Sequence, residues 1–216
     1  MKGEAFNAIS HLVGASLSIL VTVILIVLAS LYGTAWHIVS FSLFGTSLIL
    51  LYLASTLYHA SRKESWRNRM QRFDHAMILV LIAGTYTPFM LTVLRGGWGW
   101  SIFGFVWGIA ILGIIWKFVA TSITGTASTI LYLLMGWVVV VAAYPLVHVT
   151  TKHTLIFLIL GGVAYTLGAI CYSYEDHPRF QTWKITPHNI FHLFVLLGSA
   201  SHVIAIICLL PLSLHL

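Results

Sequence analysis

Seven apolar stretches, each close to twenty residues long, limit what this chain can fold into. They lie near residues 11–31, 37–60, 74–94, 98–116, 127–147, 154–173 and 188–210. An α-helix rises about 1.5 Å per residue, so about 20 residues cross the hydrocarbon core of a bilayer. The strict alternation of apolar and polar residues that is typical of barrel strands is absent. The pattern therefore predicts seven membrane-spanning helices.

The composition excludes a soluble fold. Of the 216 residues, 59% are hydrophobic and only 7% are charged, and the mean hydropathy is +0.97. Soluble domains carry about 25% charged residues and could not cover so much apolar surface. Since the connections are short, we expect one seven-helix transmembrane domain over residues 1–216. We expect an all-α integral membrane protein of the cell membrane. The first apolar stretch is too long for the core of a signal peptide, so we expect it to remain as a helix.

The positions of lysine and arginine predict the orientation of the bundle. With the N-terminus inside, nine of the eleven basic residues fall in cytoplasmic segments and two outside. The nine are Lys2, Arg62, Lys63, Arg67, Arg69, Arg72, Lys117, Arg179 and Lys184, and the two are Arg95 and Lys152. We therefore expect a cytoplasmic N-terminus and an external C-terminus. Because most of the net charge of +6 lies in one loop beside the membrane, we expect membrane lipids rather than nucleic acid as partners.

Local signals refine this picture. Thr186 and Pro187 provide a capping hydroxyl and an N1 proline for the seventh helix. Three glycines in the sixth stretch favour close packing of helices. They are Gly161, Gly162 and Gly168.

Five polar residues share one predicted depth near the cytoplasmic side. Ser55 and His59 lie at the end of the second stretch, four positions apart, so they share a helical face. The same spacing joins His188 and His192 at the start of the seventh stretch, and Asp74 opens the third. Ser55 and His192 each lie one turn, or about 6 Å, deeper than their partners. The five residues should therefore occupy a layer of about two helical turns.

This residue set is typical of a catalytic zinc site. Three neutral imidazoles, from His59, His188 and His192, suit one zinc ion per chain at about 2.0–2.1 Å and leave a fourth position for water. Asp74 is a candidate acceptor for a proton from that water. Ser55 is a candidate hydrogen-bonding partner for Asp74, the water or a substrate oxygen.

Simpler interpretations remain open for each residue alone. A single histidine near a membrane interface needs no ligand, a pair spaced by four residues often arises by chance, and Asp74 is close enough in sequence to pair with Arg69 or Arg72. The combination favours function, because ionisable groups within spans cost about 2.5–3.5 kcal/mol even on lenient insertion scales.

Other polar residues of the spans are less informative. A group near the start of the first helix either reaches the site and supports its ligands, or caps and solvates the helix start. Its members are Glu4, Asn7 and His11. His202 lies ten residues beyond His192, about 15 Å deeper along the helix. We expect it to bond to a neighbouring helix rather than to share the ion.

Together these residues resemble the haemolysin III family, which belongs with the progestin and adipoQ receptors. The resemblance rests on S-x-x-x-H ending the second helix, Asp opening the third and H-x-x-x-H opening the seventh. Flanking motifs agree, namely Glu4-Ala-Phe-Asn7 followed by His11, Ala83-Gly-Thr-Tyr-Thr-Pro88, and His192-Leu-Phe followed by Gly198 and His202. The resemblance implies seven helices with the N-terminus inside and zinc bound by the three histidines. It also matches Asp74 and Ser55 to the family's acidic and hydroxyl positions.

Three functions remain open at this stage. The first is a zinc-dependent hydrolase of a lipid amide or a related bond, which the resemblance favours because relatives in the superfamily are linked to ceramide hydrolysis. The second is a haemolysin-like, pore-forming protein, although the stretches show no charged stripe to line a channel. The third is a non-catalytic sensor of membrane state with structural zinc, although structural sites usually have four protein ligands.

Overall fold

The computed structural model describes residues 3–119, 125–175, 177–180 and 185–210. Its elements are α1 (Glu4–Tyr32), α2 (Ala35–Ala60), α3 (Glu64–Leu91), α4 (Gly97–Val119), α5 (Thr126–Trp137), the 3₁₀ helix η1 (Val138–Ala142), α6 (Ala143–Val149), α7 (Lys152–Ser173), the 3₁₀ helix η2 (Pro178–Phe180) and α8 (Pro187–Ile207). Because α5, η1 and α6 form one continuous span, the described residues contain seven helices long and apolar enough to cross a membrane. The predicted seven-span fold is confirmed.

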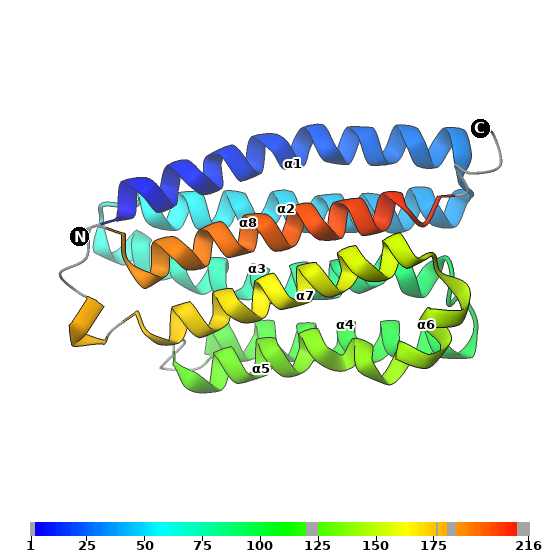
Figure 1. The fold of residues 1–216 in the computed structure, drawn as a ribbon. Coiled ribbons are helices and arrows are strands. Elements are labelled where there is room, and N and C mark those ends of the chain that lie inside the picture. Colours follow the sequence, from blue (N-terminus) through cyan, green and yellow to red (C-terminus); the bar gives the residue numbers. More distant parts are fainter. Residues whose placement is uncertain (1–2, 120–124, 176, 181–184, 211–216) are drawn as a thin grey trace.

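The spans run side by side in one bundle (Figure 1). α3 is the central helix, since it packs against α2, α4, α5 and α8 and has the largest buried share of any span. α1 packs on α2 and α8 at the edge of the bundle. The start of α1, the end of α2 and the starts of α3 and α8 all lie at the same end of the bundle (Figure 1). This end, called the site end below, is the one predicted to be cytoplasmic.

Two helices begin earlier than the sequence predicted. α1 begins at Glu4 rather than near residue 11, and α3 begins at Glu64 rather than at residue 74. Hydropathy missed both segments because they are polar, although good helix formers continue the helix beyond the apolar part. Asp74 consequently lies in the third turn of α3 and does not open that helix. The other predicted ends agree with the structure within three residues.

The start of α8 is fixed by a reciprocal cap. Asn189 N donates to Thr186 Oγ1 at 3.2 Å, and Thr186 N donates to Asn189 Oδ1 at 2.9 Å. Together with Pro187 at the first position, this capping box sets the direction in which α8 leaves the loop. The cap therefore positions the first turn of α8, which holds His188.

The predicted packing role holds for two of the three glycines of α7. Gly161 faces the ring of His202, and a side chain at Gly168 would meet Phe194 Cβ at 3.1 Å. Gly162 has nothing within 4 Å of an added Cβ, so close packing does not explain it. It lines an internal cavity instead.

The fifth span is interrupted by a tyrosine from α3. Tyr86 donates to Gly136 O at 2.7 Å and accepts a hydrogen bond from Val139 N at 2.7 Å. The hydroxyl thus satisfies backbone groups where the α-helix changes to a 3₁₀ turn. Tyr86 and Gly136 also line the internal cavity. The contact between α3 and the fifth span is therefore part of the cavity wall.

Candidate metal centre

Three histidines from two helices meet at the site end. His59 comes from the last turn of α2, and His188 and His192 come from consecutive turns of α8. Each offers one ring nitrogen, and the three nitrogens lie within 4.8 Å of one another. Their ring centroids are 4.8–5.1 Å apart. The helices thus bring together donors that are more than a hundred residues apart in the chain.

Two of these imidazole rings contact a carboxylate through Nδ1. His59 Nδ1 lies 2.6 Å from Glu4 Oε2 in the first turn of α1. His188 Nδ1 lies 2.8 Å from Oε1 of Glu175, a residue just after the end of α7. A carboxylate is an acceptor, so each Nδ1 donates its hydrogen and each Nε2 keeps its lone pair for another partner. Carboxylate–histidine–metal arrangements have this form.

The free nitrogens fit a metal ion. His59 Nε2 and His192 Nδ1 are buried and have no hydrogen-bond partner among the described residues. An unsatisfied buried polar atom costs about 1–3 kcal/mol, which a bound cation would offset. Nitrogens that share a tetrahedral zinc ion at about 2.0–2.1 Å lie about 3.3 Å apart, so small rotations of the rings suffice. The three residues can therefore hold a metal ion.

One face of α1 supports the histidines. Glu4 also accepts a hydrogen bond from Arg67 at 2.6 Å, which ties α1 to α3. Asn7 Oδ1 accepts from Asn189 Nδ2 at 2.7 Å at the start of α8. His11 is only 2% exposed and stacks on His192 with 3.7 Å between ring centroids. Direct contacts therefore support the interpretation that this helix start holds the metal-binding histidines in place. None of the three residues caps the start of α1 by its side chain.

Ser55 and Asp74 lie beside the histidines. Both are buried, at 1% and 8% exposure, and Ser55 is within hydrogen-bonding reach of the Asp74 carboxyl. Asp74 forms no ion pair with an arginine in the described part of the chain. Arg72 turns away to donate to Lys117 O at 2.8 Å. The simple salt-bridge interpretation of Asp74 is therefore wrong.

An internal cavity of about 320 Å³ starts at these residues and runs along the bundle. Ser55, Asp74 and His188 line it, and so does His202. His188 and His202 are fourteen residues apart on α8, or about 21 Å along its axis. Most of the wall between them is apolar, from α3, α5, α7 and α8. The candidate centre thus opens into a long apolar space.

His202 lies outside the cluster, as the sequence predicted. Its Nε2 lies 3.2 Å from Leu158 O of α7, so it bonds to a neighbouring helix. Two residues used in the sequence argument, Lys2 and Lys184, lie outside the described part of the chain.

Glu175 is the site residue that the sequence reasoning missed. It lies in a loop, and neither hydropathy nor helical spacing connects it with His188 thirteen positions later. The scarcity of acids was the available signal, since the chain has only five Asp and Glu residues. Three of them, Glu4, Asp74 and Glu175, lie at the candidate centre.

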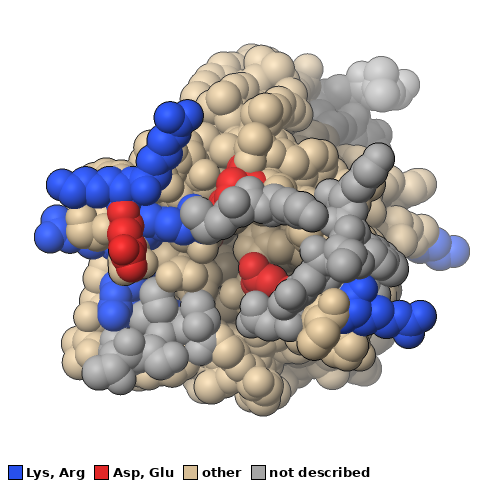
Figure 2. All heavy atoms as spheres, turned by 90° about the vertical axis from the view of Figure 1, so that its left-hand side faces the viewer, with Lys and Arg blue, Asp and Glu red and all other residues tan. Residues whose placement is uncertain are grey.

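At the site end, basic and acidic side chains occupy different parts of the surface. In Figure 2, Lys and Arg atoms lie mainly along the rim of this face, whereas two of the acidic patches lie closer to its middle. Glu4 and Glu175 are the acids that contact the histidines. These two carboxylates favour a cation locally, beside the histidines that they contact.

Comparison with known proteins agrees with the residue pattern. The model of the family described as haemolysin-III related matches residues 1–203. Hemolysin-3 of Bacillus cereus is 42% identical over 200 residues, which cover 93% of this chain and 88% of the relative. A hemolysin-3 homolog of Bacillus subtilis (strain 168) is 41% identical over 203 residues, which cover 93% and 91%. The chain is therefore a multi-pass membrane protein that belongs to the haemolysin III family.

Proposed function

We propose that this protein is a zinc-dependent membrane hydrolase that cleaves a lipid amide or a related bond near the cytoplasmic leaflet. One observation carries the proposal. Ser55, Asp74 and His188 line the same cavity, and the remaining walls of that cavity are mostly apolar. Polar groups suited to hydrolysis thus lie at one end of a space suited to a hydrocarbon chain.

The metal is assigned from the donors. Three imidazoles without a cysteine favour zinc among the common biological cations. His59, His188 and His192 would hold the ion, and a zinc ion bound there would supply Lewis-acid chemistry to a water in the fourth position. Glu4 and Glu175 hold His59 and His188 in the tautomer that leaves Nε2 available.

Asp74 is the proposed proton acceptor. It takes a proton from the attacking water at a carboxylate oxygen and later delivers it to the leaving nitrogen of the amide. No arginine of the described chain competes for that oxygen. Ser55 is within hydrogen-bonding reach of this carboxyl and would orient it. Asp74 lies on α3, whereas the three histidines lie on α2 and α8, and it is not one of the three clustered metal-binding side chains. It therefore acts beside the ion in this proposal.

The cavity is the proposed binding site for the apolar part of the substrate. Its volume of about 320 Å³ falls at the small end of the range of about 300–1,000 Å³ that is typical of ligand pockets. Leu51, Ile78 and Phe89 are among its apolar lining residues. A lipid chain placed there would bring its polar end to Asp74 and His188.

A second candidate function is lysis of membranes. It is favoured by the name Hemolysin-3 of the Bacillus cereus relative. The two functions predict different dependences on the metal centre. A hydrolase needs the histidines and Asp74 for every turnover, whereas a pore needs only the assembled spans.

The experiment compares both activities on one preparation. Zinc-loaded protein is reconstituted into vesicles, and release of fatty acid from a panel of ceramides and N-acyl amines is measured beside leakage of a trapped dye. We expect hydrolysis that a chelator abolishes, that zinc restores, and that the His188→Ala, His192→Ala double variant lacks. Leakage without hydrolysis would support lysis. A zinc-loaded protein that shows neither activity would support the sensor hypothesis.

A further inference from the structure

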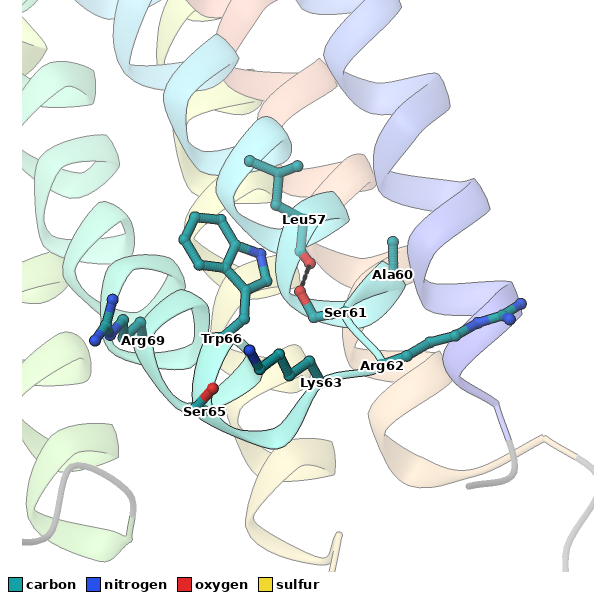
Figure 3. A pocket seen from close by; sticks show the side chains of 8 residues that line it. All are labelled: Leu57, Ala60, Ser61, Arg62, Lys63, Ser65, Trp66 and Arg69. Carbon is teal, nitrogen blue, oxygen red and sulfur yellow. Dashed lines mark hydrogen bonds between the residues drawn. The ribbon is translucent and has the colours of Figure 1, made fainter.

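A second hollow, of about 660 Å³, lies at the site end where α2 passes into α3. Figure 3 shows its lining, which combines apolar side chains from the end of α2 with cationic side chains from the connection and the first turns of α3. The lining residues are Leu57, Ala60, Ser61, Arg62, Lys63, Ser65, Trp66 and Arg69. None of them belongs to the candidate metal centre. We propose that this hollow binds the headgroup of an anionic phospholipid, with the lipid chains running along the outside of α2.

The basic residues of this region divide into two groups. Arg67 is bonded to Glu4 at 2.6 Å, and Arg72 donates to Lys117 O at 2.8 Å. These two cations are therefore already used within the protein. The presence of Arg67 and Arg72 in this basic cluster is thus explained by contacts within the protein, without a ligand.

The other three cations line the hollow. Arg62, Lys63 and Arg69 are exposed, and none forms a hydrogen bond or an ion pair with any residue in the described part of the chain. The acid of this segment, Glu64, is not a lining residue. An excess of three positive charges around one hollow is complementary to a phosphate group.

The first turn of α3 adds to this potential. α3 begins at Glu64, and its N-cap residue, Lys63, makes no side-chain cap. The amides at a helix start carry partial positive charge and favour anions. Ser65 brings a hydroxyl to the same lining, whereas the Ser61 hydroxyl already donates to Leu57 O.

The apolar side of the hollow selects a lipid over a soluble phosphate. Leu57 and Trp66 are 48% and 47% exposed, and both line the hollow (Figure 3). Leu57 is on a membrane-spanning helix and faces its outside, so lipid chains contact it in a bilayer. Tryptophan near the end of a span is typical of the headgroup level. The hollow therefore offers positive charge towards water and apolar surface towards the membrane.

The test uses the full chain in nanodiscs of equal parts phosphatidylglycerol and phosphatidylcholine. Lipids that stay bound when the nanodisc is dissociated are counted by native mass spectrometry. We expect phosphatidylglycerol to be enriched over its share in the disc. The Arg62→Gln, Lys63→Gln, Arg69→Gln variant should lose that enrichment, and each single change should reduce it by about fivefold or less.

The matched control removes the same charge elsewhere. The Arg95→Gln, Lys152→Gln, Arg179→Gln variant alters three basic residues outside the hollow and should keep the enrichment. Equal losses in the two triple variants would overturn the proposal, because they would show attraction by net charge alone. Retained enrichment in the first variant would overturn it as well. Thermal unfolding of each variant checks the fold, and Lys63→Gln alone serves if the triple change unfolds the protein.

Two further measurements identify the ligand as a lipid. Phosphatidylglycerol with brominated chains should quench the fluorescence of Trp66 more than brominated phosphatidylcholine does, and Trp66→Phe should remove the difference. Glycerol phosphate carries the charge without the chains, so it should not displace the bound lipid. Displacement by glycerol phosphate would instead indicate a site for soluble phosphates and would overturn the assignment. All of these readouts are independent of zinc and of hydrolysis.

Discussion

Glu4 Oε2 lies 2.6 Å from His59 Nδ1, although the two residues are 55 positions apart in the chain. This contact joins the first turn of α1 to the last turn of α2 and fixes the direction of the His59 ring. The same carboxylate holds Arg67 of α3. Three helices therefore converge on one side chain directly behind the proposed metal ligand.

Loss of this contact should weaken metal binding. Glu4→Ala should lower zinc affinity by about 10- to 100-fold, because the ring loses the partner that fixes its tautomer and orientation. Competition with a chromophoric chelator measures the affinity. Glu64→Ala is the matched control, since Glu64 is exposed in the first turn of α3 and should not matter. Unchanged affinity in Glu4→Ala would exclude a supporting role for this carboxylate.

The zinc content itself tests the ligand set. Purified protein should hold about one zinc ion per chain, as three imidazole donors imply. His59→Ala, His188→Ala and His192→Ala should each lose most of it, whereas His202→Ala should retain it because His202 bonds to α7 instead. Elemental analysis of the four variants decides the matter. Full occupancy after loss of both His188 and His192 would contradict the site.

The Asp74→Asn substitution distinguishes a role of Asp74 in proton transfer from a role in metal binding or folding. The amide keeps the shape of the side chain and the capacity to hydrogen-bond with Ser55, but it cannot accept the proton. We expect zinc content and thermal stability to stay near the wild-type values while turnover of a cleaved lipid amide falls about 10²- to 10⁴-fold. Ser55→Ala should cause a smaller loss of the same kind. Loss of zinc from Asp74→Asn would mean that the carboxylate is a ligand.

The orientation of the bundle is tested by accessibility. In a background without Cys171 and Cys208, a cysteine at exposed Asn68 should react with a membrane-impermeant reagent only from the cytoplasmic side. A cysteine at Gly97, which has open space around it, should react only from outside. Labelling of intact and permeabilised cells distinguishes the two. The reverse pattern would place the centre at the other leaflet.

The packing of α7 on α8 gives a stability prediction. Gly161 lies directly against the His202 ring, so Gly161→Ala should destabilise the protein by about 1–3 kcal/mol through overpacking. Gly162→Ala should have little effect, because nothing lies within 4 Å of the added atom. Unfolding curves of the two variants in the same detergent provide the comparison. Equal stability would show that the helices separate without cost.

Hydropathy and spacing accounted for much of this architecture. Each apolar stretch needs only its own length and composition to be identified as a span, because the bilayer demands that each span satisfy its backbone internally. The polar starts of α1 and α3 escaped this reasoning, since hydropathy does not register a helix that continues into the headgroup layer or water. The shift of Asp74 from the start of α3 to its third turn followed from that error.

The sequence by itself determined the seven spans and the helical faces that carry the candidate residues, because both depend on the period of a single helix. Only the tertiary structure decided which faces meet. The contacts of Glu4 with His59, of Glu175 with His188 and of His11 with His192 join segments that no local period relates. The division of the basic segment 62–72 into cations bonded within the protein and cations that line the hollow has the same origin. Such contacts depend on how the helices pack, and packing is a property of the whole bundle.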